Sequence, residues 1–176
     1  MSIDDGEGID AFVVMGVCGV GKTTLGRALA ARLCAAFVEA DDHHPQSSKD
    51  MMAAGIPLTD AEREPWLLSI SADARQRRVA TGMPVVIACS ALRRRYRALL
   101  STEIGRVYFL YLTGDEDELR ARIARRRDHF MPASMLDSQL ATLEPLGSDE
   151  PGMALDFERG TEALVAEVLG HYPLET

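Results

Sequence analysis

Residues 16–23 of this 176-residue chain read Gly-Val-Cys-Gly-Val-Gly-Lys-Thr and satisfy the pattern G-x-x-x-x-G-K-[ST]. A short apolar run at 11–15 precedes the pattern, and leucines spaced four apart along 22–33 follow it as one helix face. A strand, a glycine-rich turn and a helix in this order gather backbone N–H groups around an anion-sized hollow. The segment therefore predicts a loop that binds the phosphates of a nucleoside triphosphate.

The last residues of this loop add specific phosphate chemistry. Lys22 can reach the β- and γ-phosphates as a mobile positive charge, and the Thr23 hydroxyl can ligate Mg²⁺. Cys18 is interpreted as a small side chain that fills a tight turn, because phosphoryl transfer needs no thiol. A thiol activated by the helix dipole is the alternative for Cys18.

The rest of the chain alternates strand-like and helix-like segments. Strands are expected at 36–39, 84–89, 107–112 and 154–157, and helices at about 65–80, 117–126 and 161–169. Thr59 and Glu62 fit a capping box, and residues 113–116 repeat this pattern. Pro65 predicts the start of a new helix, because proline is tolerated in the first turn of a helix. This alternation predicts an α/β fold: one domain over residues 1–176, with a mostly parallel five-stranded sheet and helices on both faces.

The composition and charge of the chain argue against several classes of protein. Nineteen Lys and Arg against 27 Asp and Glu give a net charge of −8, which argues against nucleic-acid binding. No apolar run approaches the ~20 residues of a membrane span, and the N-terminus is acidic, unlike a signal peptide. Three widely spaced cysteines suggest neither disulfides nor zinc, so the cytoplasm is expected. The chain has no asparagine, so it lacks the guanine-reading N-K-x-D of GTPases. A small-metabolite kinase remains.

A run of acidic and histidine residues, 39–45, follows the second expected strand. Ligands bind at the carboxyl ends of strands in such sheets, so this run should face the same crevice as the phosphate loop. The Asp41 carboxylate can orient an attacking hydroxyl and take its proton, or it can hold the water shell of a metal. A transition-metal site is disfavoured because adjacent strand residues diverge. His44 and Pro45 also fit simple turn punctuation.

An arginine cluster, 93–97, leaves the third expected strand. Cations in the first turn of a helix oppose the helix dipole, so an anionic ligand explains their position better than stability does. Some of these arginines still form a solvated face, because consecutive helical residues point in different directions.

A second arginine cluster, 122–127, ends a helix, where cations suit the dipole. Its density just before a proline-containing loop predicts a small helical lid over about 122–138. Arg122 and Arg126 are assigned to this lid, where they would neutralise charge on the transferring group, and the others to the solvated face.

Five segments together resemble the gluconokinase family. They are Gly16-x4-Gly-Lys-Thr, Asp41-x-x-His44-Pro45, Asp60-x-x-Arg63-x-Pro65-Trp66, Cys89-Ser-Ala-Leu-Arg-x-x-Tyr96-Arg97 and His129-Phe130-Met131. The similarity spans about residues 13–169. Shikimate kinase is the nearest alternative, but it usually carries a Gly-Gly-Gly turn where this chain has Cys89-Ser90-Ala91.

The resemblance implies ATP-dependent phosphorylation of D-gluconate on its terminal hydroxyl. It also implies a P-loop kinase fold like that of shikimate and adenylate kinases, and a homodimer. The chain departs from the family pattern at Cys18, Ala40 and Arg93, where serine, glycine and lysine are common. None of these departures removes a needed functional group.

Site residues are assigned on these grounds, with ATP and Mg²⁺ as cofactors. The ATP-binding set is Gly16, Val17, Cys18, Gly19, Val20, Gly21, Lys22, Thr23, Thr24 and Arg122. The catalytic set is Lys22, Asp41 and Arg126, the metal ligand is Thr23, and the substrate-binding set is Asp41, His44, Arg63 and Arg97. Arg97 or Arg63 is expected to bind the gluconate carboxylate, because a guanidinium matches it bidentately. Trp66 is expected to pack rather than to stack on a ligand. Residues 1–10 are expected to form a flexible N-terminus.

Overall fold

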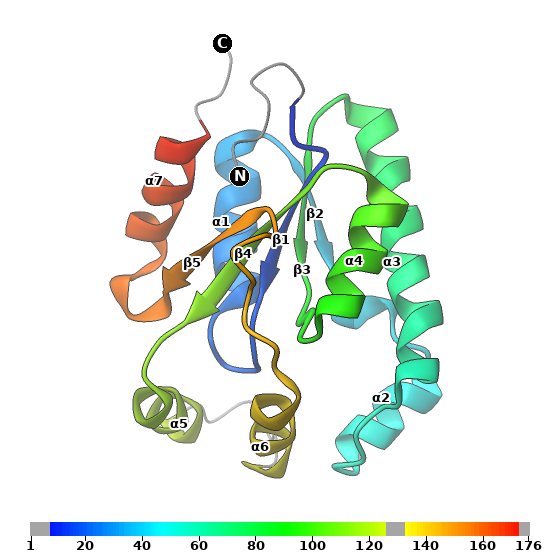
Figure 1. Ribbon diagram of the computed structural model, residues 1–176, viewed down its shortest axis with the longest axis vertical. Coiled ribbons are helices and arrows are strands. Elements are labelled where there is room, and N and C mark those ends of the chain that lie inside the picture. The colour runs from blue at the N-terminus through cyan, green and yellow to red at the C-terminus, as the bar shows by residue number, and fades with distance from the viewer. Residues whose placement is uncertain (1–7, 126–132, 173–176) are drawn as a thin grey trace.

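The computed structural model describes residues 8–125 and 133–172, and its centre is a parallel sheet of five strands (Figure 1). The strands are β1 (Ala11–Met15), β2 (Ala36–Glu39), β3 (Val85–Ala88), β4 (Val107–Thr113) and β5 (Gly152–Asp156). They lie in the order β2-β3-β1-β4-β5, and every adjacent pair is parallel. The sequence-based prediction of a five-stranded parallel sheet is thus confirmed.

Helices cover both faces of this sheet. They are α1 (Lys22–Leu33), α2 (Gln46–Ala53), α3 (Asp60–Thr81), α4 (Arg94–Ile104), α5 (Glu116–Arg125), α6 (Ala133–Thr142) and α7 (Thr161–His171). In Figure 1, α1 and α7 lie on one side of the sheet and α3 and α4 on the other, whereas α2, α5 and α6 lie beyond its lower end. That end is where the strands finish. None of the described helices is long and apolar enough to cross a membrane.

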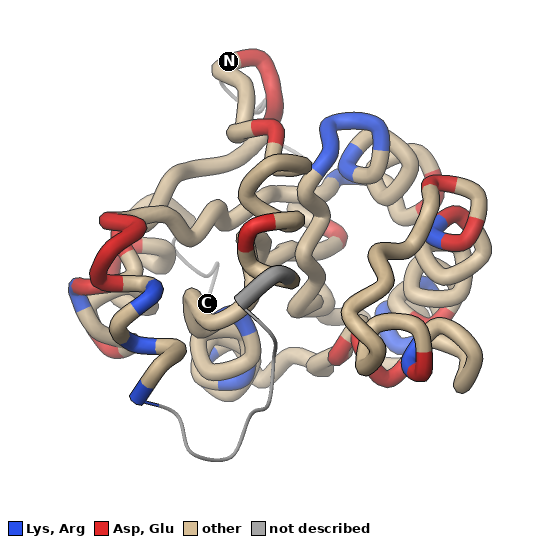
Figure 2. The backbone as a smooth tube through the Cα atoms, turned by 90° about the horizontal axis from the view of Figure 1, so that it is seen from below, with Lys and Arg blue, Asp and Glu red and all other residues tan. Residues whose placement is uncertain are grey.

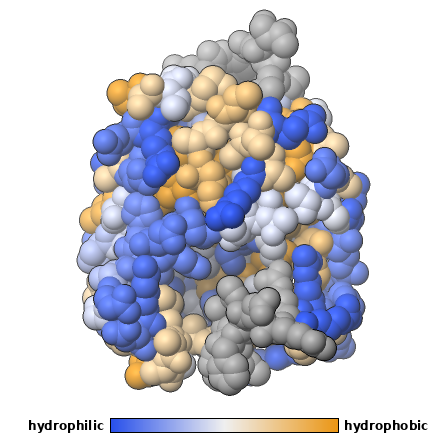
Figure 3. Space-filling view, turned by 180° about the vertical axis from the view of Figure 1, so that it is seen from behind, coloured by the Kyte–Doolittle hydropathy of each residue, from blue (hydrophilic) through white to orange (hydrophobic). Residues whose placement is uncertain are grey.

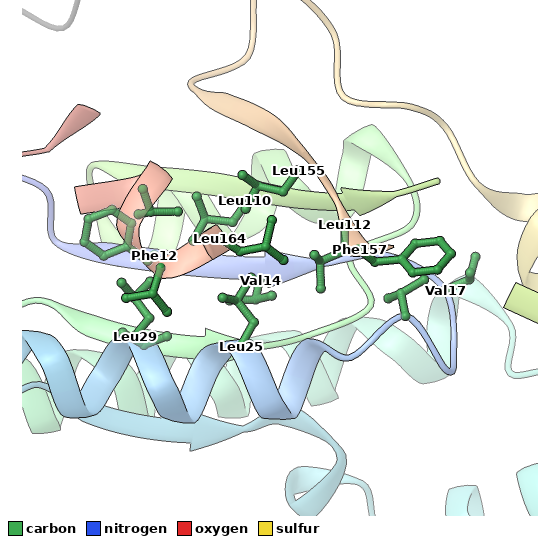
Figure 4. Packing of buried hydrophobic residues seen from close by; sticks show 14 of the residues in the cluster. Phe12, Val14, Val17, Leu25, Leu29, Leu110, Leu112, Leu155, Phe157 and Leu164 are labelled. Atoms are coloured by element: carbon green, nitrogen blue, oxygen red, sulfur yellow. The ribbon is translucent and has the colours of Figure 1, made fainter. Parts of the chain in front are cut away.

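Both faces of the central strand β1 are buried because its side chains alternate between two cores. Phe12 and Val14 point into the core beneath α1 and α7, and Val13 points into the core beneath α3 and α4. Figure 4 shows Leu25 and Leu29 of α1 rising toward the strand side chains of the first core. A strand buried on both faces is apolar throughout, which is why the run at 11–15 shows no polar alternation.

Two helix starts differ from their predicted form. The capping box of Thr59 and Glu62 is present, but α3 then runs without interruption through Pro65. The proline removes a single N–H from the ladder near the start of a long helix, and burial of the remaining turns outweighs that loss. Helix α5 is capped by Asp115, which accepts the Glu118 N–H at 2.9 Å, and not by Thr113.

Helix α2 lies in a stretch that was expected to be helical but was not predicted as a separate helix, and α6 was expected only as part of the small helical lid. Helix α6 covers the latter part of the predicted lid at 122–138, and α5 ends at Arg125, so residues 126–132 of that segment lie outside the described residues. Residues 1–7 of the expected flexible N-terminus also lie outside them. Asp10, at the end of that segment, is buried and pairs with Arg78 and Arg106.

The surface seen from behind is mainly hydrophilic, with a smaller apolar area between polar side chains (Figure 3). Three large apolar side chains are exposed among the described residues: Ile56, Leu68 and Val79.

Candidate active site

The phosphate loop joins β1 to α1 through three glycines in the left-handed region. The φ angles of Gly16, Gly19 and Gly21 are +139°, +84° and +102°. A Cβ at Gly19 would lie 2.5 Å from Ile123 of α5. The loop therefore needs glycine both for its turn and for the close approach of α5.

The start of α1 is an exposed electropositive end. Gly21 is its N-terminal boundary, and no side chain caps the helix there. The N–H groups of the first turn have no partner within the helix, and the helix dipole adds partial positive charge at this end. Phosphate oxygens supply what these groups lack.

Lys22 lies over the loop, with its Nζ donating to the Val17 carbonyl oxygen at 2.9 Å. Burial lowers the pKa of the Lys22 ammonium, and the nearby Asp41 carboxylate opposes that shift. The ammonium is therefore poorly solvated and next to an acidic group, ready to exchange the carbonyl for a phosphate oxygen.

Thr23 and Glu39 form the candidate magnesium site. The Thr23 hydroxyl donates to Glu39 Oε2 at 2.7 Å, which joins the start of α1 to the end of β2. Burial raises the pKa of the Glu39 carboxyl, although the bond from Thr23 opposes the shift. A hydroxyl and a carboxylate are the hard oxygen donors that Mg²⁺ takes in phosphoryl-transfer sites, where few protein ligands are needed. No cluster of three or more His, Cys, Asp or Glu suited to a metal occurs in 8–125 or 133–172.

A pocket of ≈ 410 Å³ opens beside the loop, at the strand ends. Its lining residues are Cys18, Lys22, Asp41, Asp42, His44, Lys49, Met52, Ala53, Pro57, Leu58, Arg63, Ser90, Leu92, Met135, Ser138, Gln139 and Thr142. The structure thus brings together five residues that the sequence assigned to the site: Cys18, Lys22, Asp41, His44 and Arg63. Viewed from this end, basic and acidic residues are interspersed around the molecule (Figure 2).

Asp41 lies in the 3₁₀ turn Ala40–His43 that follows β2. Its side chain is exposed to the pocket, while its carbonyl accepts the His44 N–H at 3.3 Å. The turn thus places Asp41 in the same pocket as Lys22, close enough for its carboxylate to act on the ammonium. An acceptor hydroxyl between them would meet a proton acceptor on one side and a phosphate-binding cation on the other.

His44 is a buried pocket residue with an unused nitrogen. Its ring stacks on Trp66 with centroids 4.2 Å apart and planes 9° from parallel, and the Trp66 indole donates to the Ala40 carbonyl at 2.7 Å. His44 Nδ1 is buried and has no hydrogen-bond partner within the described residues. Burial lowers the pKa of His44 to about 4, so the ring is neutral at physiological pH. Trp66 packs against the protein, as predicted.

Arg63 is the guanidinium that reaches the pocket. Its Nε donates to the Leu58 carbonyl at 3.3 Å, and its guanidinium lies 5.8 Å from the centre of the Tyr96 ring. Its two terminal nitrogens bond no residue that the structure describes, so they are available to an anion. The Tyr96 hydroxyl donates to Asp60, which also pairs with Arg93, and this fixes the ring beneath Arg63.

Arg97 does not line the pocket, which corrects its assignment to the substrate. Its side chain is 1% exposed and pairs with Glu150 at 2.6 and 2.8 Å. The same guanidinium donates to the carbonyls of Ala91, Leu92, Glu144 and Pro145. The Arg97 side chain is buried, and its bonds join α4 to the segment before β5. Its donors are therefore committed to the protein, and its role here is structural.

The remaining predicted site residues fall into four groups. Val17 and Val20 bury their side chains in the core, so only their backbone can meet a phosphate. Arg122 lies beside the loop: its guanidinium is 5.8 Å from the Phe157 ring centre, and a Cβ at Gly21 would lie 3.7 Å from its Nη2. Thr24 is exposed. Arg126 lies outside the described residues.

Sequence reasoning missed several polar residues of the site, among them Glu39, Lys49 and Gln139. Glu39 was read only as part of the acidic run, and its bond to Thr23 comes from sheet order. Lys49 lies on α2, which was not predicted as a separate helix, and Gln139 lies on α6, one residue beyond the predicted end of the lid. Two signals for those helices were available in the sequence. Pro45 immediately precedes α2, and the apolar residues Met135 and Leu136 lie within α6.

The fold and this site define a P-loop kinase. A family model described as an AAA domain matches residues 12–146. A gluconokinase of Gluconobacter oxydans is 43% identical over 93% of this chain and 92% of its own. The crystal structure of a gluconokinase from Sinorhizobium meliloti has a TM-score of 0.80 at 40% identity and covers 91% of this chain and 89% of that one. An unliganded sugar kinase from Janibacter has a TM-score of 0.86 at 42% identity, covering 93% and 94%.

These similarities extend over nearly the whole chain and include the site. The chain belongs to the gluconokinase family. As a P-loop kinase it is an enzyme that uses ATP and acts on a small molecule.

Proposed function

We propose that the protein transfers the γ-phosphoryl group of ATP to the terminal primary hydroxyl of D-gluconate, giving 6-phosphogluconate and ADP. The observation that carries the proposal is one pocket that holds both the phosphate-loop lysine and a carboxylate after β2, Lys22 and Asp41. The family relationship supplies the acceptor, because the matched relatives are gluconokinases.

Phosphate binding is assigned to the loop. The backbone N–H groups at the start of α1 and the Lys22 ammonium would hold the β- and γ-phosphates. Arg122, beside Gly21, would add a second positive charge there. When the nucleotide binds, a phosphate oxygen would replace the Val17 carbonyl as the partner of Lys22. The ammonium would then stabilise the negative charge on the transferring phosphoryl group.

Asp41 is assigned the role of general base, which accepts the proton of the acceptor hydroxyl. The acceptor hydroxyl donates a hydrogen bond to the Asp41 carboxylate, which orients an oxygen lone pair toward the γ-phosphorus. As the new P–O bond forms and the bond to ADP breaks, the hydroxyl proton passes to Asp41. The exposed position of this carboxylate lets it release the proton to water before the next cycle.

Recognition of gluconate requires a cation for its carboxylate and polar groups for its hydroxyls. Arg63 is assigned to the carboxylate because its terminal nitrogens are unused and its planar fork matches two oxygens. Lys49 lines the same pocket and adds positive charge. The neutral His44, with its unpaired Nδ1, is assigned to a hydroxyl.

Magnesium binding is assigned to Thr23 with Glu39 beside it, because their oxygens suit that ion. Bound Mg²⁺ supplies charge neutralisation on the β- and γ-phosphate oxygens. We also propose that the enzyme works in the cytoplasm as a homodimer. Cys34 and Cys89 are free thiols, the state that a reducing compartment maintains.

The direct test is ADP release from ATP in the presence of D-gluconate, shikimate or nucleoside monophosphates. We expect turnover with gluconate well above the others. The Asp41→Asn variant should lose about 10²–10⁴-fold in kcat, the usual contribution of a general base. Asp50→Asn, an exposed change on α2, is the matched control and should keep wild-type turnover. Turnover of Asp41→Asn within tenfold of wild type would remove the base role, and shikimate as the best acceptor would remove the substrate assignment.

A further inference from the structure

Gln139 forms a hydrogen bond between α6 and the phosphate loop. The Cys18 backbone N–H donates to Gln139 Oε1 at 2.7 Å, across 121 residues of sequence. A backbone N–H only donates, so the atom that faces it is the oxygen, and the orientation of the amide is thereby determined. The Gln139 side chain is held against the loop by this bond.

The other end of this amide is a donor without a partner. Gln139 Nε2 carries two N–H groups that bond no protein atom within the described residues, although the side chain lines the pocket that holds Lys22 and Asp41. Ser138 and Thr142 of the same helix also line the pocket, so α6 presents a polar edge there.

We propose that Gln139 positions the acceptor substrate, an inference that rests on the proposed function. Its Oε1 is held by the Cys18 amide, and its Nε2 donates a hydrogen bond to a hydroxyl of the sugar acid. Only a primary amide has both an acceptor for the loop and donors for the substrate at one side-chain tip. A carboxylate in its place would keep the bond to Cys18 but would present a second anion to an anionic substrate. Gln139 would thus link the phosphate loop to the placement of the acceptor.

Two variants separate these roles. Gln139→Glu keeps an oxygen for the Cys18 N–H and removes the donors, whereas Gln139→Met removes both with little change in length. We expect each to raise the KM for gluconate at least tenfold, with the KM for ATP of Gln139→Met within threefold of wild type. Gln76→Met, an exposed glutamine on α3, is the matched control and should change neither constant. A gluconate KM within threefold of wild type, or an ATP KM that rises as much as that for gluconate, would overturn the proposal.

A second readout does not depend on turnover by a variant alone. The KM values of gluconate analogues that each lack one hydroxyl are measured with wild type and with Gln139→Met. For one of these analogues, wild type should show a KM tenfold higher than for gluconate. The variant should show the same KM for that analogue as for gluconate. If every analogue loses equally in both proteins, Gln139 contacts no hydroxyl and the proposal fails. Calorimetric binding of ADP to each variant, unchanged within threefold, shows that the fold and the loop are intact. Wild-type turnover of gluconate is measured first, so a failure of the proposed function is seen separately.

Discussion

Two polar regions of the molecule differ in how their hydrogen-bonding groups are satisfied. Around Arg97, each bond partner belongs to the protein: one carboxylate and four carbonyls. Along the pocket wall, polar atoms of His44, Arg63 and Gln139 have no partner in the described chain. The first region supports the fold, and the second is available to a ligand.

The physical reason is the cost of an unpaired polar group. A buried donor or acceptor without a partner costs about 1–3 kcal/mol, so a fold keeps such groups only where they are exposed or where a ligand completes them. Residue type alone does not separate the two regions, because both contain arginine. The comparison predicts that changes around Arg97 reduce stability and that changes along the wall reduce turnover.

The largest expected effect is on stability. Arg97→Met leaves the buried Glu150 carboxylate without its cation, and we expect a loss of about 3–5 kcal/mol in the free energy of unfolding. Burial raises the pKa of Glu150, but bonds from Arg97 and the Gly147 N–H outweigh it and leave that pKa lowered, so the pair carries its charges in the fold. Urea denaturation measures the loss. Arg94→Met replaces an exposed arginine paired with Asp149; it is the control and should lose far less stability than Arg97→Met. Equal losses in the two variants would break the comparison.

The next effect concerns His44, whose pKa falls to about 4 in the fold from an ordinary 6.5. The folded protein therefore binds fewer protons than the unfolded chain between these values, and stability should fall as the pH drops from 6.5 to 4. Complete loss of this contribution amounts to about 3 kcal/mol.

Replacement by phenylalanine should remove this pH dependence and keep the stack on Trp66. Urea titrations at pH 6.5, 5.5 and 4.5 compare wild type with His44→Phe. The neighbouring His43 pairs with Asp73 and Ser69, and His43→Gln should retain the wild-type slope. If the unfolding free energy depends on pH identically in wild type and His44→Phe, the fold does not lower the pKa of His44 and this prediction is wrong.

Arg63→Met should change function with little change in stability. Hydrogen bonds to charged groups contribute about 1.5–3 kcal/mol, which corresponds to a gluconate KM roughly 10–150-fold higher. The free energy of unfolding should move by less than about 1 kcal/mol, because the side chain makes one bond to a carbonyl within the described protein. Arg63→Lys should recover part of the affinity through charge alone. Steady-state kinetics and urea denaturation, run on the same preparations, distinguish this outcome from the Arg97 result.

The smallest effect is expected for Tyr96→Phe, which tests the boundary between the two regions. The variant loses the bond to Asp60 but keeps the ring beneath Arg63. We expect a stability loss of about 1 kcal/mol and a gluconate KM within twofold of wild type. A large KM increase at unchanged stability would place this hydroxyl on the substrate side of the comparison.

Much of the fold was predictable from local pattern. The phosphate loop, the apolar strands and the Thr59 capping box each use a short stretch of chain in which spacing and residue type are sufficient. Helices α2 and α6 were not predictable in this way. Helix α2 has eight residues and only one buried side chain, so its sequence carries little periodic signal. Their positions at the end of the sheet nevertheless supply Lys49 and Gln139.

The amino-acid sequence by itself determined the phosphate loop, the parallel sheet and the presence of Asp41 and His44 at a strand end, because these depend on neighbours within a few residues. Only the tertiary structure decided which arginine lines the pocket and which is paired with Glu150. That choice depends on partners 53 residues away, and on whether packing leaves the guanidinium any donor to spare. Long-range contact, not residue type, separates Arg63 from Arg97.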